Sequence, residues 1–281
     1  MFKLLKGMAI ATVLFFFLFG TANAENVRSL SVSSLNPLLA MAGSEETEYF
    51  PLHSIDEIEN FLNNRANVLV KNANYRGYES LQEIVSPKHR AIDPSLPIDE
   101  QVNACDSCTF LNIPTQHPFH NGEIEIDVAS TLPENAPGWA KGFIGIMFRV
   151  DARYFPDGTI DAKHSTYEGF YLRPVNSQSD RQSDRDHSVQ YISMPGYAWY
   201  YLRRNSPGKY ETYTPLQPGN WTKMRIEVQD TVARLYLNDS LEPALIVNDL
   251  KQGKELSGTI GLYTEPQTIA YFKNLKITHI P

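Results

Sequence analysis

The sequence predicts an all-β protein built as an antiparallel β-sandwich. Three observations favour this fold class. Apolar and polar residues alternate with a period of two in many short segments after residue 121, and Asp-Gly and Pro-Gly pairs lie between these segments. No amphipathic helical pattern separates them, whereas a parallel sheet needs helical crossovers. Short strands at even spacing, joined by turns, are typical of antiparallel sandwiches.

The first residues carry the features of an export signal. Two lysines precede an apolar run over residues 8–20, and the small-x-small triplet Ala-Asn-Ala occupies residues 22–24. We therefore expect residues 1–24 to be a signal peptide that is removed on export, which makes the mature protein secreted or periplasmic. No later segment is apolar enough to predict membrane insertion.

We expect residues 25–63 to form an N-terminal extension and residues 64–281 to form one sandwich domain. A β-sandwich of this length often forms a single domain. Within the extension, Ser54 as an N-cap with Glu57 three residues later predicts a short helix over residues 54–63.

The two cysteines, Cys105 and Cys108, are separated by two residues. In an exported protein we expect them to form a disulfide. His117 and His120 follow them, so a zinc site with the spacing Cys-x2-Cys-x8-His-x2-His is the alternative. The narrow gap between the histidines and the oxidising compartment favour the disulfide, and we expect no metal at these residues.

Alternation assigns the strands in chain order. Two short strands flank a turn at residues 75–77, and another covers residues 122–128, with isoleucines and a valine on one face and Glu123, Glu125 and Asp127 on the other. We interpret these carboxylates as a solvated acidic face. The outer two are about 13 Å apart along a strand, whereas a retaining glycosidase needs carboxyl groups about 5 Å apart.

The remaining strands are expected from the same alternation. In residues 169–174, Phe170 and Leu172 face the core, while Tyr171 and Arg173 lie on the opposite face. Residues 176–187 are polar and are expected to form a long exposed loop. The other predicted strands cover residues 143–150, 189–193, 223–228, 233–238, 258–263 and 270–278.

Aromatic residues are concentrated in one part of the chain. Nine of the fifteen tyrosines, together with Trp199, fall between Tyr154 and Tyr213, with arginines interleaved. Strand propensity explains any single tyrosine, but the cluster favours a recognition surface. Aromatic rings stack on the apolar faces of sugars, and guanidinium groups donate paired hydrogen bonds to hydroxyl or carboxylate oxygens. The formal net charge of -7 argues against nucleic acid as a partner.

Five strings carry a family resemblance: Phe119-His-Asn-Gly-Glu-Ile-Glu, Gly145-Ile-Met-Phe-Arg, Tyr167-Glu-Gly-Phe-Tyr, Gly258-Thr-Ile-Gly-Leu and Ala270-Tyr-Phe-Lys-Asn. Together they resemble the concanavalin A-like lectin/glucanase superfamily, and within it laminin G-like modules and 3-keto-disaccharide hydrolase-like domains. The resemblance covers about residues 64 to 280. It implies an antiparallel jelly-roll β-sandwich with two curved sheets and a ligand on the concave one.

The resemblance also suggests site residues. Its pattern of a Gly-Ile-x-Phe-Arg strand followed by a strand that begins with Tyr-Glu places Arg149 and Glu168 on the concave face as ligand-binding residues. Alternation along the neighbouring strands adds further ligand-binding residues to that face, namely Tyr171, Arg173, Gln190 and Tyr191.

Trp199 and Tyr200 are the expected stacking rings, and Trp139 is a further candidate. If the protein is catalytic, the candidate acid, base or nucleophile is Glu168, Tyr191 or His187.

We expect no cofactor, with calcium as the one alternative. Asp151, Asp157 and Asp161 flank a predicted turn and could supply oxygen ligands. The pair Asp157-Gly158 is explained more simply by the turn itself.

The sequence thus predicts an exported carbohydrate-binding jelly-roll protein that recognises a glycan on its concave face. Two alternatives stay open: a glycan-cleaving enzyme, either a glycoside hydrolase or a polysaccharide lyase, and an extracytoplasmic protein-interaction module. An enzyme should carry a titratable group with a perturbed pKa in its groove. An interaction module should instead present a flat apolar patch.

Overall fold

The computed structural model describes residues 45–54, 56, 64–89 and 108–280. The described residues all belong to one compact unit, Ala42–Pro281. The predicted signal peptide, Cys105 and most of the predicted helix over residues 54–63 lie outside the described residues. Among those that are described, no helix is long and apolar enough to cross a membrane.

Two antiparallel sheets form the fold, as the sequence predicts. In sheet A the strands lie in the order β13 (Leu245–Val247), β12 (Val232–Leu237), β11 (Thr222–Gln229), β6 (Asn121–Thr131), β15 (Ile269–Ile280), β4 (Tyr78–Val85) and β3 (Val68–Tyr75), with β1 (Glu46–Phe50) also paired to β15. In sheet B the order is β10 (Glu211–Thr212), β9 (Val189–Met194), β8 (Thr166–Leu172), β7 (Ile144–Asp151), β14 (Thr259–Thr264), β5 (Phe110–Ile113) and β2 (Arg65–Ala66).

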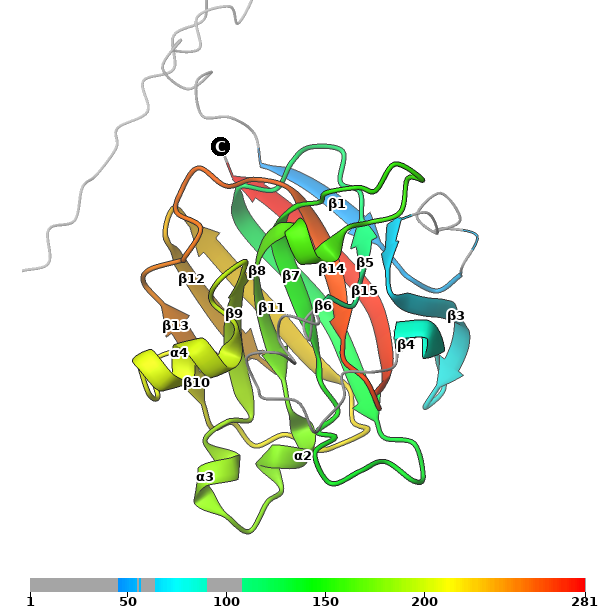
Figure 1. Ribbon diagram of the computed structural model, residues 1–281, viewed down its shortest axis with the longest axis vertical. Helices are drawn as coiled ribbons and strands as arrows, with labels where there is room; N and C mark the ends of the chain where they lie inside the picture. The colour runs from blue at the N-terminus through cyan, green and yellow to red at the C-terminus, as the bar shows by residue number, and fades with distance from the viewer. Residues whose placement is uncertain (1–44, 55, 57–63, 90–107, 281) are drawn as a thin grey trace, which may run out of the picture. The chain divides into compact units, whose positions relative to one another are not determined.

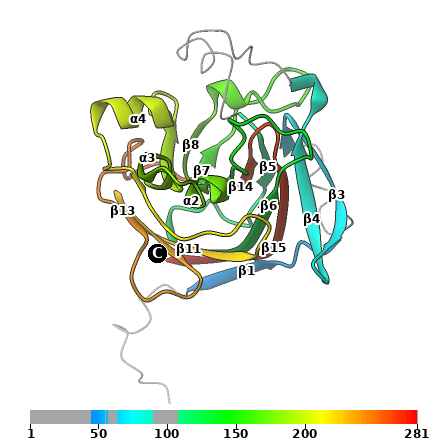
Figure 2. The ribbon, with the colours of Figure 1, turned by 90° about the horizontal axis from the view of Figure 1, so that it is seen from below.

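The sheets form two layers, with the β3–β4 hairpin on one side and α4 on the other (Figure 2). Short helices connect the strands of sheet B near its edges (Figure 1). The helical segments are α2 (Pro174–Ser177), α3 (Gln182–Arg185), α4 (Trp199–Asn205) and the 3-10 helices η3 (Pro87–His89) and η4 (Ala162–His164).

The main apolar core lies between the sheets and follows the alternation in the sequence. On β6, Ile124, Ile126 and Val128 are buried in this core. On β8, Phe170 and Leu172 face it too, which confirms their predicted orientation. Burial of such side chains is the main favourable term for the sandwich, at roughly 1.5–3 kcal/mol for each large one.

The acidic face of β6 points away from this core, and its carboxylates form ion pairs with neighbouring strands. Glu125 lies 2.8 Å from Lys276 Nζ, and Asp127 lies 2.8 Å from Lys273 Nζ. Glu123 lies 2.9 Å from Arg225 on β11. Each carboxylate is thus paired with a cation away from the core, which supports the interpretation of this strand as a solvated acidic face.

Several elements lie where the sequence analysis expected none. The strand β1 falls within the predicted N-terminal extension, yet it pairs with β15 along its whole length, so the sandwich includes residues upstream of 64. The predicted loop at residues 176–187 contains the short helices α2 and α3, and α4 follows β9. These helices have only four to seven residues, too few to give a helical period in the sequence.

A second apolar cluster covers the face of sheet B that points away from sheet A, called the outer face below. Tyr167, Tyr171 and Tyr263 belong to this cluster and are fully buried. Ile160 and Ala162, from the connection between β7 and β8, pack into the same cluster. Much of the surface that the sequence analysis assigned to a ligand is therefore covered by the protein's own chain.

Candidate functional site

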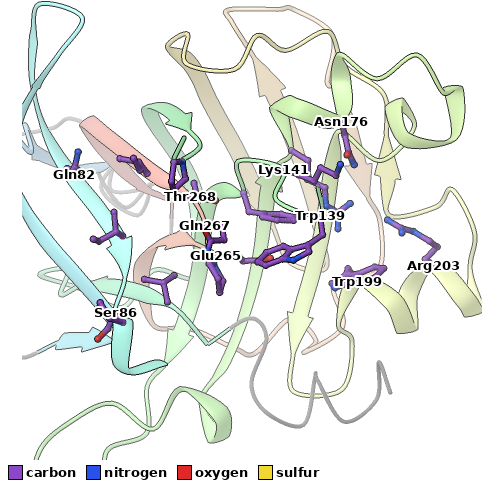
Figure 3. Close-up of a pocket in the computed structure, with 18 residues that line it drawn as sticks. Gln82, Ser86, Trp139, Lys141, Asn176, Trp199, Arg203, Glu265, Gln267 and Thr268 are labelled. Atoms are coloured by element: carbon purple, nitrogen blue, oxygen red, sulfur yellow. The ribbon is translucent and has the colours of Figure 1, made fainter. Parts of the chain in front are cut away.

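A pocket of about 800 Å³ lies beside the part of the outer face that remains uncovered. Five separate parts of the chain line it: β4 with the start of η3, the connection between β6 and β7, the end of β8 with α2, α4, and the connection between β14 and β15. Figure 3 shows side chains from these segments converging on one space.

Aromatic rings form the centre of the pocket. Trp139 is 48% exposed, a large fraction for a tryptophan, and Trp199 and Phe143 line the same space. In Figure 3, Trp139 lies between Glu265 and Gln267 on one side and Trp199 on the other. Exposed indole rings in a concave site offer flat apolar faces to a ligand.

Arg173 supplies the first positive charge. It follows β8 and is only 4% exposed. Its Nη1 donates hydrogen bonds to the carbonyl oxygen of His187 at 3.1 Å and to Gln190 Oε1 at 3.3 Å. Its Nη2 donates to the hydroxyl of Tyr171. These contacts fix the guanidinium at the wall of the pocket.

Arg203 supplies the second positive charge, and it is paired with a carboxylate. Its Nε and Nη2 donate to Glu211 Oε2 at 2.9 and 2.7 Å, and His187 Nδ1 lies 2.9 Å from the same oxygen. Burial raises the pKa of Glu211, but hydrogen bonds from His187 and Arg203 outweigh it, so this pKa is lowered. Glu211 is therefore ionised at neutral pH and neutralises much of this charge.

One carboxylate lines the pocket among the described residues. Glu265, in the connection between β14 and β15, is 6% exposed and accepts a hydrogen bond from the Tyr263 hydroxyl. Lys141 also lines the pocket, and its Nζ donates to the carbonyl oxygen of Gly138 at 2.7 Å. Cationic and anionic groups thus meet around aromatic rings, an arrangement suited to a polar ligand with apolar faces.

The predicted ligand-binding residues fall into four groups. Arg173 and Trp199 line the pocket. Tyr171 and Gln190 are fully buried behind it and hold Arg173. Tyr200 forms an edge contact with Trp199 at 6.0 Å between ring centres but does not line the pocket. The remaining predicted residues lie elsewhere.

Glu168 and Tyr191 face the interior of the sandwich. Both are fully buried, and the Tyr191 hydroxyl donates to a Glu168 carboxylate oxygen. The backbone N–H of Gln252 donates to Glu168 at 2.9 Å, and that of Lys251 donates to the Tyr191 hydroxyl at 3.0 Å. Burial raises the pKa of Glu168 against the opposing effect of these hydrogen bonds. The pair fastens residues 251–252 to sheet B and has no opening to the pocket.

Arg149 lies at a β-bulge, where the register between β7 and β8 shifts. It is fully buried with a φ of 54°, in the left-handed region. Its guanidinium donates to the carbonyl oxygens of His120, Asp230 and Gly253 and to Asn121 Oδ1. The family resemblance suggested a ligand-binding role for Arg149, but its contacts instead join sheet B to the end of sheet A.

The other predicted residues that the structure describes lie outside the pocket lining. His187 is a neighbour of the pocket through its contact with Glu211 but does not line it. Cys108 is disulfide-bonded, and Cys105, the other cysteine of the chain, lies outside the described residues. The alternative zinc ligands have other contacts: His117 lies 3.2 Å from Glu46, and the ring of His120 bonds a backbone carbonyl.

The three aspartates considered for calcium each have local contacts. Asp151 lies 3.2 Å from Arg153, Asp157 accepts hydrogen bonds from Thr159, and Asp161 caps η4. Within the described ranges, no three His, Cys, Asp or Glu side chains come together as a metal site.

Sequence reasoning missed Phe143, Lys141, Gln82 and Glu265 as residues of the pocket. They come from three connections or strands that only the tertiary fold brings together. The sequence did indicate Trp139 as a ligand-binding residue, because a tryptophan that follows Gly138 in a turn before the next strand is poorly explained as a core residue. No pattern in the sequence singled out Glu265.

Comparison with known proteins agrees with this architecture. Residues 99–278 match the model of a family described as the 3-keto-alpha-glucoside-1,2-lyase-like domain. The chain belongs to this family. The predicted resemblance to 3-keto-disaccharide hydrolase-like jelly rolls is therefore confirmed, and the chain is a carbohydrate-related jelly-roll protein. No curated protein matches it.

Solved structures with a related fold are distant in sequence. A Bacillus subtilis protein of unknown function with a galectin-like fold shares 14% identity at a TM-score of 0.48, covering 83% of this chain and 94% of that one. The carbohydrate-binding module CBM66 from Bacillus subtilis shares 15% identity at a TM-score of 0.41, covering 76% and 97%. A putative glycosyl hydrolase from Parabacteroides distasonis shares 13% identity at 0.41, covering 83% and 100%.

Proposed function

We propose that this protein is exported and binds a carbohydrate in the pocket between β4 and α4. The observation that carries the proposal is the half-exposed ring of Trp139 in the middle of a cleft edged by polar side chains. A sugar ring presents an apolar face of C–H groups and a rim of hydroxyls, so it matches an indole face surrounded by hydrogen-bonding groups. Membership of a carbohydrate-related family supports the same ligand class.

The shape of the site favours a sugar over a protein partner. A pocket of about 800 Å³ falls within the size range of small-molecule sites, whereas a protein-interaction module would use a broad apolar patch. Lys141, Gln82, Asn176 and Thr268 line the pocket and offer donors and acceptors around its rim.

A glycan array probed with the protein from residue 25 onward tests the proposal, followed by calorimetry on the best ligands. The variant Trp139→Ala should weaken binding at least about tenfold, because the stacking ring is lost. Phe155→Ala is the matched control, since Phe155 is also 48% exposed and lies outside the pocket lining. Equal affinity in both variants and the wild type would reject the pocket as the binding site.

A glycan-cleaving activity is the second candidate, favoured by the buried carboxylate of Glu265 in the pocket wall. A carboxylate held by Tyr263 beside a bound sugar could act as a general acid or base. Incubation of array ligands with the protein, with analysis for new reducing ends or unsaturated products, separates the two functions. An enzyme should lose turnover but keep ligand binding in Glu265→Gln. Binding without any turnover by the wild type leaves a lectin-like role.

Export is tested by fractionation of cells that express the complete chain. The mature protein should appear outside the cytoplasm with Glu25 as its first residue by mass spectrometry. Retention of residues 1–24 in a cytoplasmic protein would contradict this part of the proposal.

A further inference from the structure

We propose that the pocket prefers an acidic sugar, and that Arg173 binds the carboxylate of a uronic acid residue. This inference rests on the proposed carbohydrate-binding function and narrows it from sugars in general to one chemical class. Three observations carry it: the charge of Arg173 has no carboxylate partner, part of its guanidinium is unused, and the surrounding pocket is positive.

The first observation is the missing counterion. Arg173 is 4% exposed, yet its hydrogen bonds go to a backbone carbonyl oxygen, an amide oxygen and a tyrosine hydroxyl, all of them uncharged acceptors. Within the described part of the chain, Arg173 forms no ion pair. A buried cation without a partner is costly, and functional sites are where such a cost is retained.

The second observation is the direction of the unused hydrogens. A guanidinium has five N–H donors. Both hydrogens of Nη1 have acceptors, and one hydrogen of Nη2 is directed to Tyr171. The Nε hydrogen and the second Nη2 hydrogen have no acceptor among the described residues. Nε and Nη2 share one edge of a guanidinium, and such an edge can bind the two oxygens of a carboxylate.

Arg203 shows this geometry at the neighbouring position. Its Nε and Nη2 bind the carboxylate of Glu211, so the equivalent edge is already filled by the protein itself. Arg173 and Arg203 both contact the ring of Trp199, with Cζ atoms 5.6 and 4.7 Å from its centre. Arg173 and Arg203 therefore contact the same tryptophan, but only Arg203 is paired with a carboxylate of the protein.

The third observation is the rigidity and sign of the site. The Arg173 guanidinium carbon lies 4.8 Å from the ring centre of Tyr171 and 5.8 Å from that of Phe143, so aromatic rings enclose it on several sides. Enclosure by rings excludes water and strengthens the attraction for an anion. Arg203 is neutralised by Glu211, so the charges left in the pocket lining are those of Lys141, Arg173 and one acidic residue, Glu265, in a chain whose net charge is -7. This local excess of positive charge favours an anionic group on the ligand.

The test compares each ligand with its own uncharged counterpart. Oligogalacturonate, oligoalginate and glucuronate-containing oligosaccharides are used as probes, together with carboxyl-reduced forms of each. Reduction replaces the carboxylate with a hydroxymethyl group and keeps the ring. Calorimetry with the wild type should show at least one acidic probe binding about tenfold or more tightly than its reduced form, the effect of one charge-assisted pair.

Two variants assign this preference to Arg173. Arg173→Lys keeps the charge but loses the paired donors, so the preference for the acidic form should fall to about threefold or less, while the reduced form binds as it does to the wild type. Arg225→Lys is the matched control, because Arg225 is paired with Glu123 on sheet A and lies outside the pocket lining, and this variant should keep the full preference. Thermal unfolding of each variant verifies that the domain is folded.

The outcomes separate the two levels of the proposal. Binding of neutral and acidic probes with equal affinity overturns the acidic preference and leaves the carbohydrate function intact. A preference that survives in Arg173→Lys also overturns the assignment to Arg173. If neither series nor any glycan on the array binds, the carbohydrate function fails and this inference fails with it.

Discussion

Sheet B carries two fully or almost fully buried arginines, and their surroundings differ in one respect. Arg149, at the bulge of β7, donates to four acceptors from different parts of the chain and lies near the carboxylate of Glu168. Arg173, at the end of β8, has three uncharged acceptors and an unused edge in the wall of a pocket. Of five N–H donors, Arg149 has one and Arg173 has two without an acceptor among the described residues, and only Arg173 lines the pocket, where a ligand can reach it.

Two buried carboxylates differ in the same way, one being bound by the fold and the other lining the pocket. Glu168 is bound by Tyr191 and a backbone N–H in the interior, whereas Glu265 lines the pocket. The region around Arg149 should therefore determine stability with no effect on ligand binding, and the pocket should determine binding with little effect on stability. Four variants test this separation.

The largest expected effect is on Arg149. Replacing it by methionine leaves the carbonyl oxygens of His120, Asp230 and Gly253 without their donor and leaves the buried Glu168 without a nearby cation. Loss of one partner of a buried charged network costs about 3–5 kcal/mol. Urea denaturation of Arg149→Met should show a loss of this size. A loss below about 1 kcal/mol would show that the hydrogen bonds of Arg149 do not determine the stability of the domain.

Tyr191→Phe should have the next largest effect. The phenylalanine fills the same space but leaves the N–H of Lys251 without an acceptor and removes a donor from Glu168. Leaving buried polar groups unpaired costs roughly 1–3 kcal/mol. Urea denaturation measures the loss, and calorimetry should show unchanged affinity for any glycan that the wild type binds. Weaker binding without a loss of stability would assign Tyr191 to the site after all.

Glu83 on β4 is a third buried acidic residue, and it differs from Glu168 and Glu265 because it has no partner in the described part of the chain. It is fully buried, and neither of its carboxyl oxygens has a hydrogen-bond partner among the described residues. Burial raises the pKa of Glu83 well above its ordinary value of 4.5, so the folded protein holds this proton more tightly than the unfolded chain. The stability that the protonated Glu83 carboxyl group contributes is fully present below about pH 4.5. It is lost as the pH rises toward the pKa of this group in the folded protein.

Glu83→Gln removes this titration and keeps the shape. The difference in the free energy of unfolding between variant and wild type should change in favour of the variant as the pH rises from 4 to 8. Denaturant titrations across this range measure it. A difference that stays constant with pH would show that Glu83 keeps its charge when the protein folds.

The smallest effect on stability is expected for Trp139→Ala. Because the ring is half exposed, its removal should change the free energy of unfolding by about 0.5 kcal/mol or less, although it weakens glycan binding. Thermal unfolding measures this alongside Phe155→Ala. A large loss of stability would mean that Trp139 is part of the core and not a ligand platform.

More of the fold than of the site could be predicted from the sequence. Alternation is a local property, and it correctly separated Phe170 and Leu172 from Tyr171 and Arg173 along β8. Arg149, assigned to the ligand face by the family resemblance, lies at a bulge, which changes the face of one residue and leaves no mark in the hydrophobic pattern.

The pocket depends on contacts between residues far apart in the chain. Gln82 and Glu265 line one space although more than 180 residues separate them, and no motif links the two positions. Glu168 was assigned to the ligand face by resemblance alone. Its register against Phe148 and Ser193 instead places it with the core residues of β8. Alternation from Phe170 would have given the same answer.

The pairing of β1 with β15 has a consequence for engineering. Glu46 on the first strand lies directly opposite His279 on the last, so the two ends of the folded sandwich are neighbours on one edge of sheet A. A short linker could join them, with new ends opened at the exposed turn around Gly208. Chains rearranged in this way usually fold when the old ends are adjacent and the new ends lie in an exposed loop. The domain is thus suited to insertion into a host protein as a self-contained module.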